Sequence, residues 1–301
     1  MIPVFPEFKQ VDSSDRQAVE SHTHRFPPYS DINFVSLWTW DVTGERKISE
    51  LNGNLVILFT DYKTHKPVLS FLGINGVPET IKTLLKYSEE NALPAQLKLI
   101  PEVSLEGSDS SNLHIEEDRD NFDYIYSVAE LSKMTGGKFK GRRNFVNKFM
   151  TEHPTATFHK IDLTDPATHE KIMSVIEARA QHKVALGKVD DNVNEEKALQ
   201  RLFESTLTDS LVGSAVIEQG RMIAFSIEEI LPNSYCLSHF WKGDTAYPGV
   251  YDFLMQQKCR NLETLGVTYL NYEQDLGIEG LRRSKMDYQP VDFLRKYSIV
   301  G

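Results

Sequence analysis

Two carboxylates, Glu273 and Asp275, directly follow a predicted strand over residues 268–272. A strand is a rigid support, so a carboxylate placed there could face a cleft and hydrogen-bond an amino group or accept its proton. Glu273 and Asp275 are therefore candidate catalytic residues. In the alternative interpretation, Asp275 and Glu279 are ordinary acidic residues at the start of the next helix, where the helix dipole favours negative charge.

That next helix, predicted over residues 277–285, begins with two glycines and carries cations in its first turns. Unpaired backbone N–H groups at a helix start, together with nearby cations, suit an anionic ligand. We expect Arg282 to hold a phosphate or carboxylate group, unless the cations only form a solvated helix face. The candidate substrate-binding residues of this helix are Arg282, Arg283 and Lys285.

A third candidate carboxylate lies near the end of another predicted strand, residues 222–230, which contains Glu228 and Glu229. Because side chains alternate along a strand, one of the two should face inward, where it could deprotonate an attacking amine or orient a substrate. We take Glu228 as the catalytic candidate. His239, on the neighbouring predicted strand, is a candidate partner and substrate-binding residue, and a histidine simply packed in the strand is the alternative.

A basic segment over residues 129–152 lies near the middle of the chain and is predicted as one connecting helix. Its Arg142 and Arg143 could bind the phosphates of an RNA end or a lipid headgroup, because a local group of cations attracts anions even in an acidic protein. A plain surface helix is the alternative. Phe145 and Phe149, four residues apart, predict an apolar stripe that packs into the core.

Composition limits the classes of function. The chain has 301 residues, enough for two domains, and its 33 Lys and Arg against 43 Asp and Glu give a net charge of −10, which disfavours general DNA binding. Its two cysteines, Cys236 and Cys259, have no zinc-like spacing, and we expect no metal site. Since the start of the chain does not resemble a signal peptide and no apolar run reaches roughly 20 residues, we expect a cytoplasmic protein without a transmembrane segment.

The order of predicted elements occurs twice along the chain. Each half is predicted to contain a strand, two helices, a three-stranded meander, a helix, a strand, a short helix and a strand. This order favours the α+β class, with mixed, mostly antiparallel sheets flanked by helices. We expect an N-terminal domain over residues 1–130, a basic connecting helix over 131–153 and a C-terminal domain over 154–301. The alternative is one mixed α/β domain whose pattern repeats by chance.

This order of elements resembles the GNAT fold of the acyl-CoA N-acyltransferases. Two such units in tandem resemble the Fem-type peptidyltransferases and the catalytic domain of phosphatidylglycerol lysyltransferase. Four motifs carry a resemblance to the bacterial family, largely of unknown function, that is grouped with the lysyltransferase C-terminal domain. They are Asp-Tyr-Ile-Tyr-Ser (123–127), Gly-Arg-Arg-Asn-Phe-Val-Asn-Lys-Phe (141–149), Tyr-Pro-Gly-Val-Tyr-Asp-Phe (247–253) and Asn-Tyr-Glu-Gln-Asp-Leu-Gly-Ile-Glu-Gly-Leu-Arg (271–282).

The resemblance implies transfer of an acyl group, with an aminoacyl group favoured, onto an amine or hydroxyl. In GNAT enzymes the donor's pyrophosphate binds backbone N–H groups where the last meander strand meets the long helix, here predicted over residues 250–265. The corresponding donor-binding residues are Lys242, Gly243 and Gly249, and Tyr251 of the same motif is a candidate substrate-binding residue. The loop lacks the pattern of acetyl-CoA binders, and Asp244 would repel a pyrophosphate, which favours an aminoacyl-tRNA donor or no CoA at all. Glycines that only form a turn are the alternative.

We therefore expect an acyltransferase whose active site lies in the C-terminal domain. A carboxylate would take the proton of the acceptor, which would attack the donor carbonyl directly, without a covalent enzyme intermediate and without a required cofactor. The expected partner is the anionic donor substrate, either an aminoacyl-tRNA end or acyl-CoA. The alternatives are a module that binds an anionic ligand without catalysis and an acyl-CoA-dependent N-acyltransferase.

Overall fold

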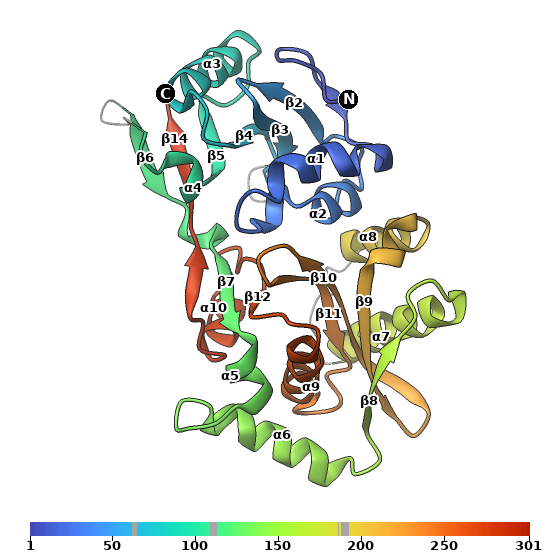
Figure 1. Cartoon of the computed structure of the whole chain (residues 1–301). Helices are drawn as coiled ribbons and strands as arrows, with labels where there is room; N and C mark the ends of the chain where they lie inside the picture. Colours follow the sequence, from blue (N-terminus) through green and yellow to red (C-terminus); the bar gives the residue numbers. More distant parts are fainter. Residues whose placement is uncertain (62–64, 109–112, 186, 188–192) are drawn as a thin grey trace. The chain divides into compact units, whose positions relative to one another are not determined.

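The chain folds into two compact units, each built from separate stretches of the sequence (Figure 1). The computed structural model describes residues 1–61, 65–108, 113–185, 187 and 193–301. Unit 1 comprises Met1–Asp123, Gln274–Glu279 and Phe293–Gly301, and unit 2 comprises Tyr124–Glu273 and Gly280–Asp292. The sequence-based division into 1–130, 131–153 and 154–301 makes each domain continuous, whereas here the end of the chain returns to unit 1.

Unit 1 contains a seven-stranded mixed sheet in the order β1-β2-β3-β4-β5-β14-β6. β4 and β5 pair in parallel, and the other neighbours pair antiparallel. The strands are β1 (Lys9–Gln10), β2 (Lys47–Leu51), β3 (Asn54–Thr60), β4 (Pro67–Leu72), β5 (Gln96–Pro101), β6 (His114–Glu117) and β14 (Lys296–Val300). The helices are α1 (Arg16–Thr23), α2 (Phe34–Thr39), α3 (Val77–Glu90) and α4 (Glu102–Leu105), with short 3-10 turns at Ser13–Asp15, Ser30–Ile32 and Arg119–Asn121.

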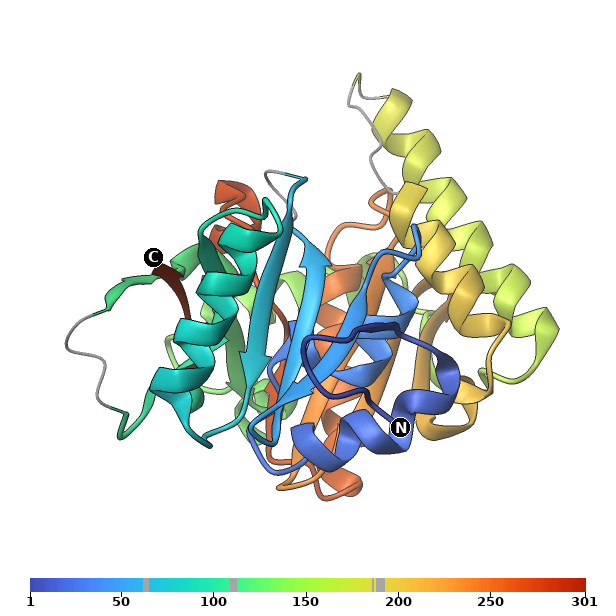
Figure 2. The ribbon, with the colours of Figure 1, turned by 90° about the horizontal axis from the view of Figure 1, so that it is seen from above.

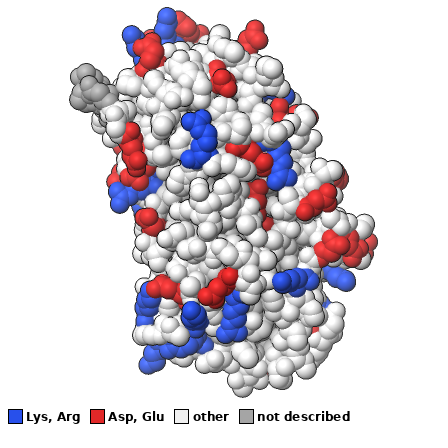
Figure 3. All heavy atoms as spheres, in the orientation of Figure 1, with Lys and Arg blue, Asp and Glu red and all other residues white. Residues whose placement is uncertain are grey.

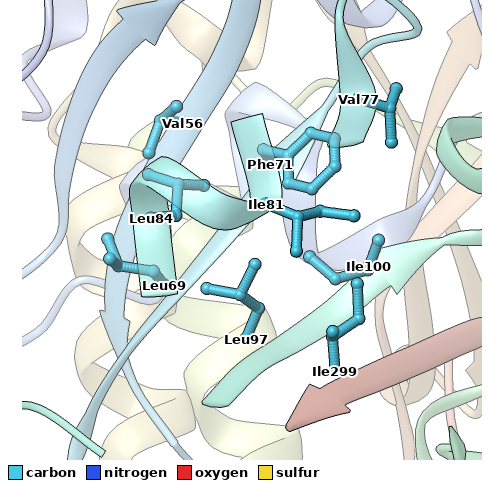
Figure 4. Close-up of a cluster of buried hydrophobic side chains, with 9 residues drawn as sticks. All are labelled: Val56, Leu69, Phe71, Val77, Ile81, Leu84, Leu97, Ile100 and Ile299. Atoms are coloured by element: carbon cyan, nitrogen blue, oxygen red, sulfur yellow. The ribbon is translucent and has the colours of Figure 1, made fainter. Parts of the chain in front are cut away.

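The core of unit 1 lies between its sheet and α3, which covers one face of the sheet (Figure 2). Ile81 and Leu84 on α3 are three residues apart, so both lie on the helix face that is buried against the strands. They meet side chains of β4 and β5 such as Phe71 and Leu97 (Figure 4). Ile299 of β14 belongs to the same cluster, so the last strand of the chain helps to complete this core.

Unit 2 contains the second seven-stranded sheet, in the order β13-β7-β12-β11-β10-β9-β8. Its strands are β7 (Asp123–Ser127), β8 (Thr157–Ile161), β9 (Leu211–Glu218), β10 (Arg221–Leu231), β11 (Tyr235–Gly243), β12 (Tyr269–Asn271) and β13 (Asp292–Leu294). Its helices are α5 (Val128–Lys133), α6 (Lys140–Glu152), α7 (Pro166–Ala185), α8 (Val193–Phe203), α9 (Val250–Thr264) and α10 (Glu279–Met286), with a 3-10 turn at Thr206–Ser210. α7 and α8 lie side by side in both ribbon views (Figures 1 and 2).

The two sheets share one order of pairings. In each sheet, five strands follow one another along the chain, and a strand from the other half of the sequence pairs with the fifth. This added strand is β14, which pairs with β5 in unit 1, and β7, which pairs with β12 in unit 2. In unit 2, as in unit 1, one neighbouring pair, β11 and β12, is parallel, while the chain-ordered strands before it pair antiparallel. The predicted α+β class, with mixed, mostly antiparallel sheets flanked by helices, is confirmed.

The prediction of one basic helix over residues 129–152 is wrong. The segment forms two helices, α5 and α6, because Met134 and Gly136 adopt positive φ angles of 47° and 79° between them. The predicted apolar stripe is correct for only one of its two residues: Phe149 is fully buried, whereas Phe145 is 48% exposed. Four-residue spacing places two side chains on one helix face but does not say how wide the covered part of that face is.

Within the described part of the chain, no helix is both long enough and apolar enough to cross a bilayer. The described residues also contain no group of three or more His, Cys, Asp or Glu side chains arranged to hold a metal ion. Both cysteines are buried and unpaired.

Candidate active site in unit 2

Glu228 lies in β10, is only 1% exposed, and faces α9. Its Oε1 accepts hydrogen bonds from Lys258 Nζ of α9 at 3.0 Å and from Ser238 Oγ of β11 at 3.3 Å. Lys258, also 1% exposed, donates a second bond to Ser238 Oγ at 3.0 Å. Glu228 Oε2, in contrast, is buried without a hydrogen-bond partner. Because buried polar atoms are nearly always paired, such an oxygen calls for an explanation.

More unpaired polar atoms lie on the same face of the sheet. Ser226 is two residues before Glu228 in β10 and is directly opposite Ser214 of β9 and Trp241 of β11, so all four side chains point toward α9. The hydroxyls of Ser214 and Ser226 and the Trp241 indole Nε1 are buried without hydrogen-bond partners. This face of β9–β11 therefore presents two hydroxyls, one N–H donor and one carboxylate oxygen that the described protein atoms leave unsatisfied.

Aromatic rings surround this polar face, and we call them the aromatic cluster: Tyr126, Trp241, Tyr251, Tyr272 and Tyr288. Their centroids are linked by distances of 4.6 Å for Trp241 to Tyr272, 5.2 Å for Trp241 to Tyr251 and 6.0 Å for Tyr126 to Tyr272. Lys258 Nζ lies 4.9 Å from the Trp241 centroid and 5.4 Å from that of Tyr272. Trp241, Tyr251 and Tyr272 are half-buried, whereas Glu228 and Lys258 are buried. The cluster thus extends from solvent to the Glu228–Lys258 pair.

Arg142, a predicted substrate-binding residue, lies at the edge of the aromatic cluster and is already paired. It contacts Asp252 at 3.1 Å and Asp287 at 2.6 Å, and its guanidinium lies 4.7 Å from the Tyr288 centroid. Tyr288 donates a hydrogen bond to Asp252 at 3.0 Å. Burial raises the pKa of the Asp252 carboxyl, and Arg142 offsets part of that rise. This network favours a role for Arg142 in holding α6 against α9 and residue 288.

The other predicted cations have different surroundings. Lys285 is buried, donates to the Tyr272 carbonyl at 2.5 Å and lies 4.8 Å from the Tyr272 ring centroid, which places it at the aromatic cluster. Arg143 donates to the carbonyls of Met134 and Gly136 at 2.5 and 2.8 Å, which favours a structural role at the turn between α5 and α6. Arg282 is half-buried and Arg283 is exposed on α10, and their substrate-binding role stays a prediction.

The structure assigns Glu273 and Asp275 to different units. In unit 2, Glu273 adopts a positive φ of 55°, supported by a hydrogen bond from its backbone N–H to Asn271 Oδ1 at 2.8 Å. Its charge is one of the causes that raise the pKa of Tyr272, after burial and neighbouring tyrosines, so it borders the aromatic cluster. In unit 1, Asp275 is fully buried and accepts hydrogen bonds from Gly277 N at 2.8 Å and Arg119 at 3.3 Å. That arrangement favours the helix-start interpretation for Asp275.

Glu229 and His239 form a separate pair. Glu229 follows Glu228 in β10, so its side chain points to the opposite face of the sheet. It lies 3.2 Å from His239 Nε2. The register between β10 and β11 shifts after Ile227, which leaves His239 outside the regular pairing. The expected partnership of His239 therefore involves Glu229, whereas Glu228 has Lys258.

The predicted donor loop is occupied by the chain's own carboxylate. Asp244 is buried and accepts hydrogen bonds from Ala246 N at 3.0 Å and from Arg221 at 2.9 Å. Lys242 is paired with Glu195 at 2.9 Å. A Cβ on Gly249, the residue before α9, would lie 2.5 Å from the Phe145 carbonyl oxygen of α6, so α6 approaches the helix start closely. Gly243 is also tightly packed, since its Cβ would lie 3.0 Å from Val250. These contacts disfavour a CoA pyrophosphate in this loop.

The cations of α5 and α6 form a visible group on the face shown in Figure 3. Three lysines of this segment form ion pairs with acidic neighbours: Lys133 with Glu263 at 3.7 Å, Lys138, which lies between the two helices, with Glu130 at 2.7 Å, and Lys148 with Glu152 at 3.7 Å. Exposed pairs of this kind reduce the local positive potential although each contributes little stability. The ion pairs favour a plain surface helix over a phosphate-binding groove.

Several residues of this site are missing from the sequence-based candidates. Lys258 and Ser238 hydrogen-bond to Glu228, and Trp241 and Tyr272 lie beside Lys258; none of these four residues was a sequence-based candidate. One signal was present: Asp252, Gln256 and Lys258 are polar residues in a helix that is otherwise apolar on much of its surface. All three are buried, and buried polar side chains in a helix indicate polar partners on the elements that pack against it.

The aromatic cluster leads to a prediction for alkaline pH. Burial raises the pKa of Tyr126, Tyr272 and Tyr288 well above the ordinary value of 10.0. Above pH 10 the unfolded chain loses these three protons while the folded unit keeps them, so the free energy of unfolding should fall by about 4 kcal/mol per pH unit. Tyrosinate absorbance and circular dichroism followed between pH 9 and 12 should show these phenols ionising only as unit 2 unfolds. Tyr288→Phe should reduce the slope by about a third; ionisation of all three in the folded state would contradict the prediction.

Comparison with known proteins first defines the class of fold. The structure is similar to that of FemX, with a TM-score of 0.56 at 12% identity over 98% of this chain and 97% of that one. It is also similar to L-PGS from Bacillus licheniformis, with a TM-score of 0.65 at 15% identity over 97% and 92% of the two chains. A conserved protein of unknown function from Bacteroides thetaiotaomicron VPI-5482 gives a TM-score of 0.83 at 23% identity over 100% and 99%. The chain therefore has the fold of FemX and of L-PGS, as expected.

The sequence then identifies the family. Residues 30–300 match the family model described as phosphatidylglycerol lysyltransferase, C-terminal. The chain belongs to this family, which confirms the resemblance seen in its motifs. No curated protein matches the chain.

Proposed function

We propose that the protein is an aminoacyltransferase that moves an aminoacyl group from aminoacyl-tRNA to an amine or hydroxyl acceptor, with its active site at Glu228. The observation that carries the proposal is the unpaired Oε2 of the buried Glu228 carboxylate. Lys258 and Ser238 hold Oε1 in place, so Oε2 is oriented while its own hydrogen-bonding capacity stays unused. A positioned carboxylate of this kind suits a general base.

The proposed reaction is a direct displacement. The acceptor N–H or O–H gives its proton to Glu228 Oε2 while the acceptor atom bonds to the carbonyl carbon of the aminoacyl ester. The ester bond to the terminal ribose of tRNA breaks, and the ribose oxygen takes up the proton that Glu228 received. Bringing donor and acceptor together supplies much of the rate acceleration. Glu273 borders the same cluster and is proposed to bind the amino group of a substrate.

The loop before α9 supports tRNA over CoA as the donor. In this loop the Asp244 carboxylate accepts hydrogen bonds from Ala246 N and Arg221. A pyrophosphate would have to compete with that carboxylate for the same donors and would be repelled by its charge. The ester of an aminoacyl-tRNA does not require a pyrophosphate site.

Thermal unfolding in the presence of donor analogues tests the proposal. A ligand that binds only the folded chain at a hundred times its Kd stabilises it by about 2.7 kcal/mol. We expect charged tRNA to raise the melting temperature by several degrees more than uncharged tRNA, and acetyl-CoA to leave it unchanged. A response that falls steeply with salt and is the same for charged and uncharged tRNA would indicate an RNA-binding module. Stabilisation by acyl-CoA alone would overturn the tRNA proposal in favour of an acyl-CoA-dependent transferase.

A further inference from the structure

The position of Lys258 bears on which aminoacyl group the site can take. Its ammonium is 3.0 Å from Glu228 Oε1 and within 5.4 Å of the ring centroids of Trp241 and Tyr272. A carboxylate beside two aromatic faces is the environment that binds a cationic side chain. In this chain an internal lysine already fills that environment.

Two further cations lie at the aromatic cluster. Arg142 pairs with Asp252 and Asp287, and the buried Lys285 lies against Tyr272. A lysyl or arginyl side chain that approached Glu228 would have to share this carboxylate with Lys258, and in a partly buried site the two like charges would repel more strongly than in water. The aromatic cluster is therefore unfavourable for a lysyl or arginyl side chain.

The atoms without partners on the same sheet face suit an uncharged group instead. Trp241 Nε1 can donate to an acyl oxygen, and the hydroxyls of Ser214 and Ser226 can either donate or accept. The half-buried rings of Trp241, Tyr251 and Tyr272 offer apolar surface to a small side chain. Glu228 Oε2 stays available as the proposed base.

We propose that this site takes an aminoacyl group with an uncharged side chain, and that Lys258 is the residue that excludes cationic aminoacyl groups. The inference rests on the aminoacyl transfer proposed above. It separates this chain from the lysyl specificity that the name of its family describes. Removing the ammonium should open the carboxylate and the two rings to a lysyl side chain.

Transfer assays with tRNAs carrying alanine, serine, lysine or arginine test the inference. The wild type should use alanyl- or seryl-tRNA at least tenfold better than lysyl- or arginyl-tRNA. Lys258→Met should shift the ratio of lysyl to alanyl transfer upward at least tenfold, whereas Lys258→Arg, which keeps the cation, should keep the wild-type preference. Circular dichroism and melting temperature establish that each variant is folded.

Each outcome decides one of the two proposals. A wild-type preference for lysyl-tRNA, or an unchanged ratio in folded Lys258→Met, would overturn the role of Lys258 and leave aminoacyl transfer standing. Failure of the wild type with all four charged tRNAs would overturn the proposed function and this inference with it. If Lys258→Met does not fold, or is folded but transfers no aminoacyl group, calorimetry on the wild type decides: tighter binding of alaninamide than of lysinamide supports the inference, and the reverse order overturns it.

Discussion

Replacing Glu228 by Gln should reduce aminoacyl transfer by about 10²- to 10⁴-fold, the range that a positioned general base contributes. Gln keeps the shape of the side chain and an acceptor oxygen for Lys258 and Ser238, but it cannot take a proton from the acceptor. Single-turnover transfer from the aminoacyl-tRNA that the wild type prefers measures the chemical step. The loss should appear in kcat, because the amide still occupies the same position.

Glu229→Gln is the matched control for this experiment. Glu229 is the next residue of the same strand and is equally buried, but its side chain contacts His239 on the other face of the sheet. Its replacement shows what the loss of a buried carboxylate does to the fold without changing the face toward α9.

In Glu228→Gln the buried Lys258 loses its counter-charge, so Glu228→Gln with Lys258→Met restores neutrality and should be folded but inactive. Transfer above a tenth of the wild-type rate in folded Glu228→Gln would exclude Glu228 as the base.

Local patterns in the sequence predicted much of the fold, because the type of a helix or strand and the direction of its side chains depend on residues that are neighbours along the chain. The long helix predicted over residues 250–265 is α9, Val250–Thr264, and Gly249 before it has a φ of 90°. Strand alternation predicted that Glu228 and Glu229 face opposite sides of a sheet. It also predicted an inward carboxylate, although both carboxylates are buried. These features follow from residue type and spacing alone.

The sheets that β7 and β14 join could not be predicted in the same way. The residues of β7 and β14 have the alternation of ordinary strands, which identifies a strand but not the sheet that it joins. Long-range pairing decides the sheet: Tyr126 of β7 pairs with Leu270, and Ile299 of β14 pairs with Leu97. For the same reason the sequence could not place Lys258 beside Glu228, 30 positions earlier in the chain. Predicting the candidate site thus requires knowledge of tertiary contacts, whereas the fold class could be predicted from local patterns.

The first residue of β14 belongs to a buried ionic cluster in unit 1. Lys296, the first residue of β14, is fully buried and donates to Asp123 Oδ1 at 2.7 Å and to Asp31. Ser30 donates to both oxygens of Asp123, from its hydroxyl at 2.6 Å and its backbone N–H at 2.8 Å. Burial acts to lower the pKa of Lys296, but the two carboxylates outweigh it and raise that pKa above its usual range. Lys296 therefore forms ion pairs with two carboxylates from distant parts of the sequence.

Lys296→Met should destabilise unit 1 by about 3–5 kcal/mol, because it removes the buried cation that contacts both carboxylates. Denaturant unfolding at pH 7 measures the loss, and Lys86→Met, which removes an exposed cation from the pair with Glu90 on α3, should leave stability unchanged. Burial raises the pKa of the Asp31 carboxyl and Lys296 offsets part of that rise, so without Lys296 this carboxyl should titrate at a higher pH in the folded variant than in the unfolded chain. The folded variant then takes up protons as the pH falls from 7 toward 5, so its deficit relative to the wild type should shrink over that window. A deficit that is independent of pH would show that Lys296 acts through packing of its aliphatic stem rather than through charge.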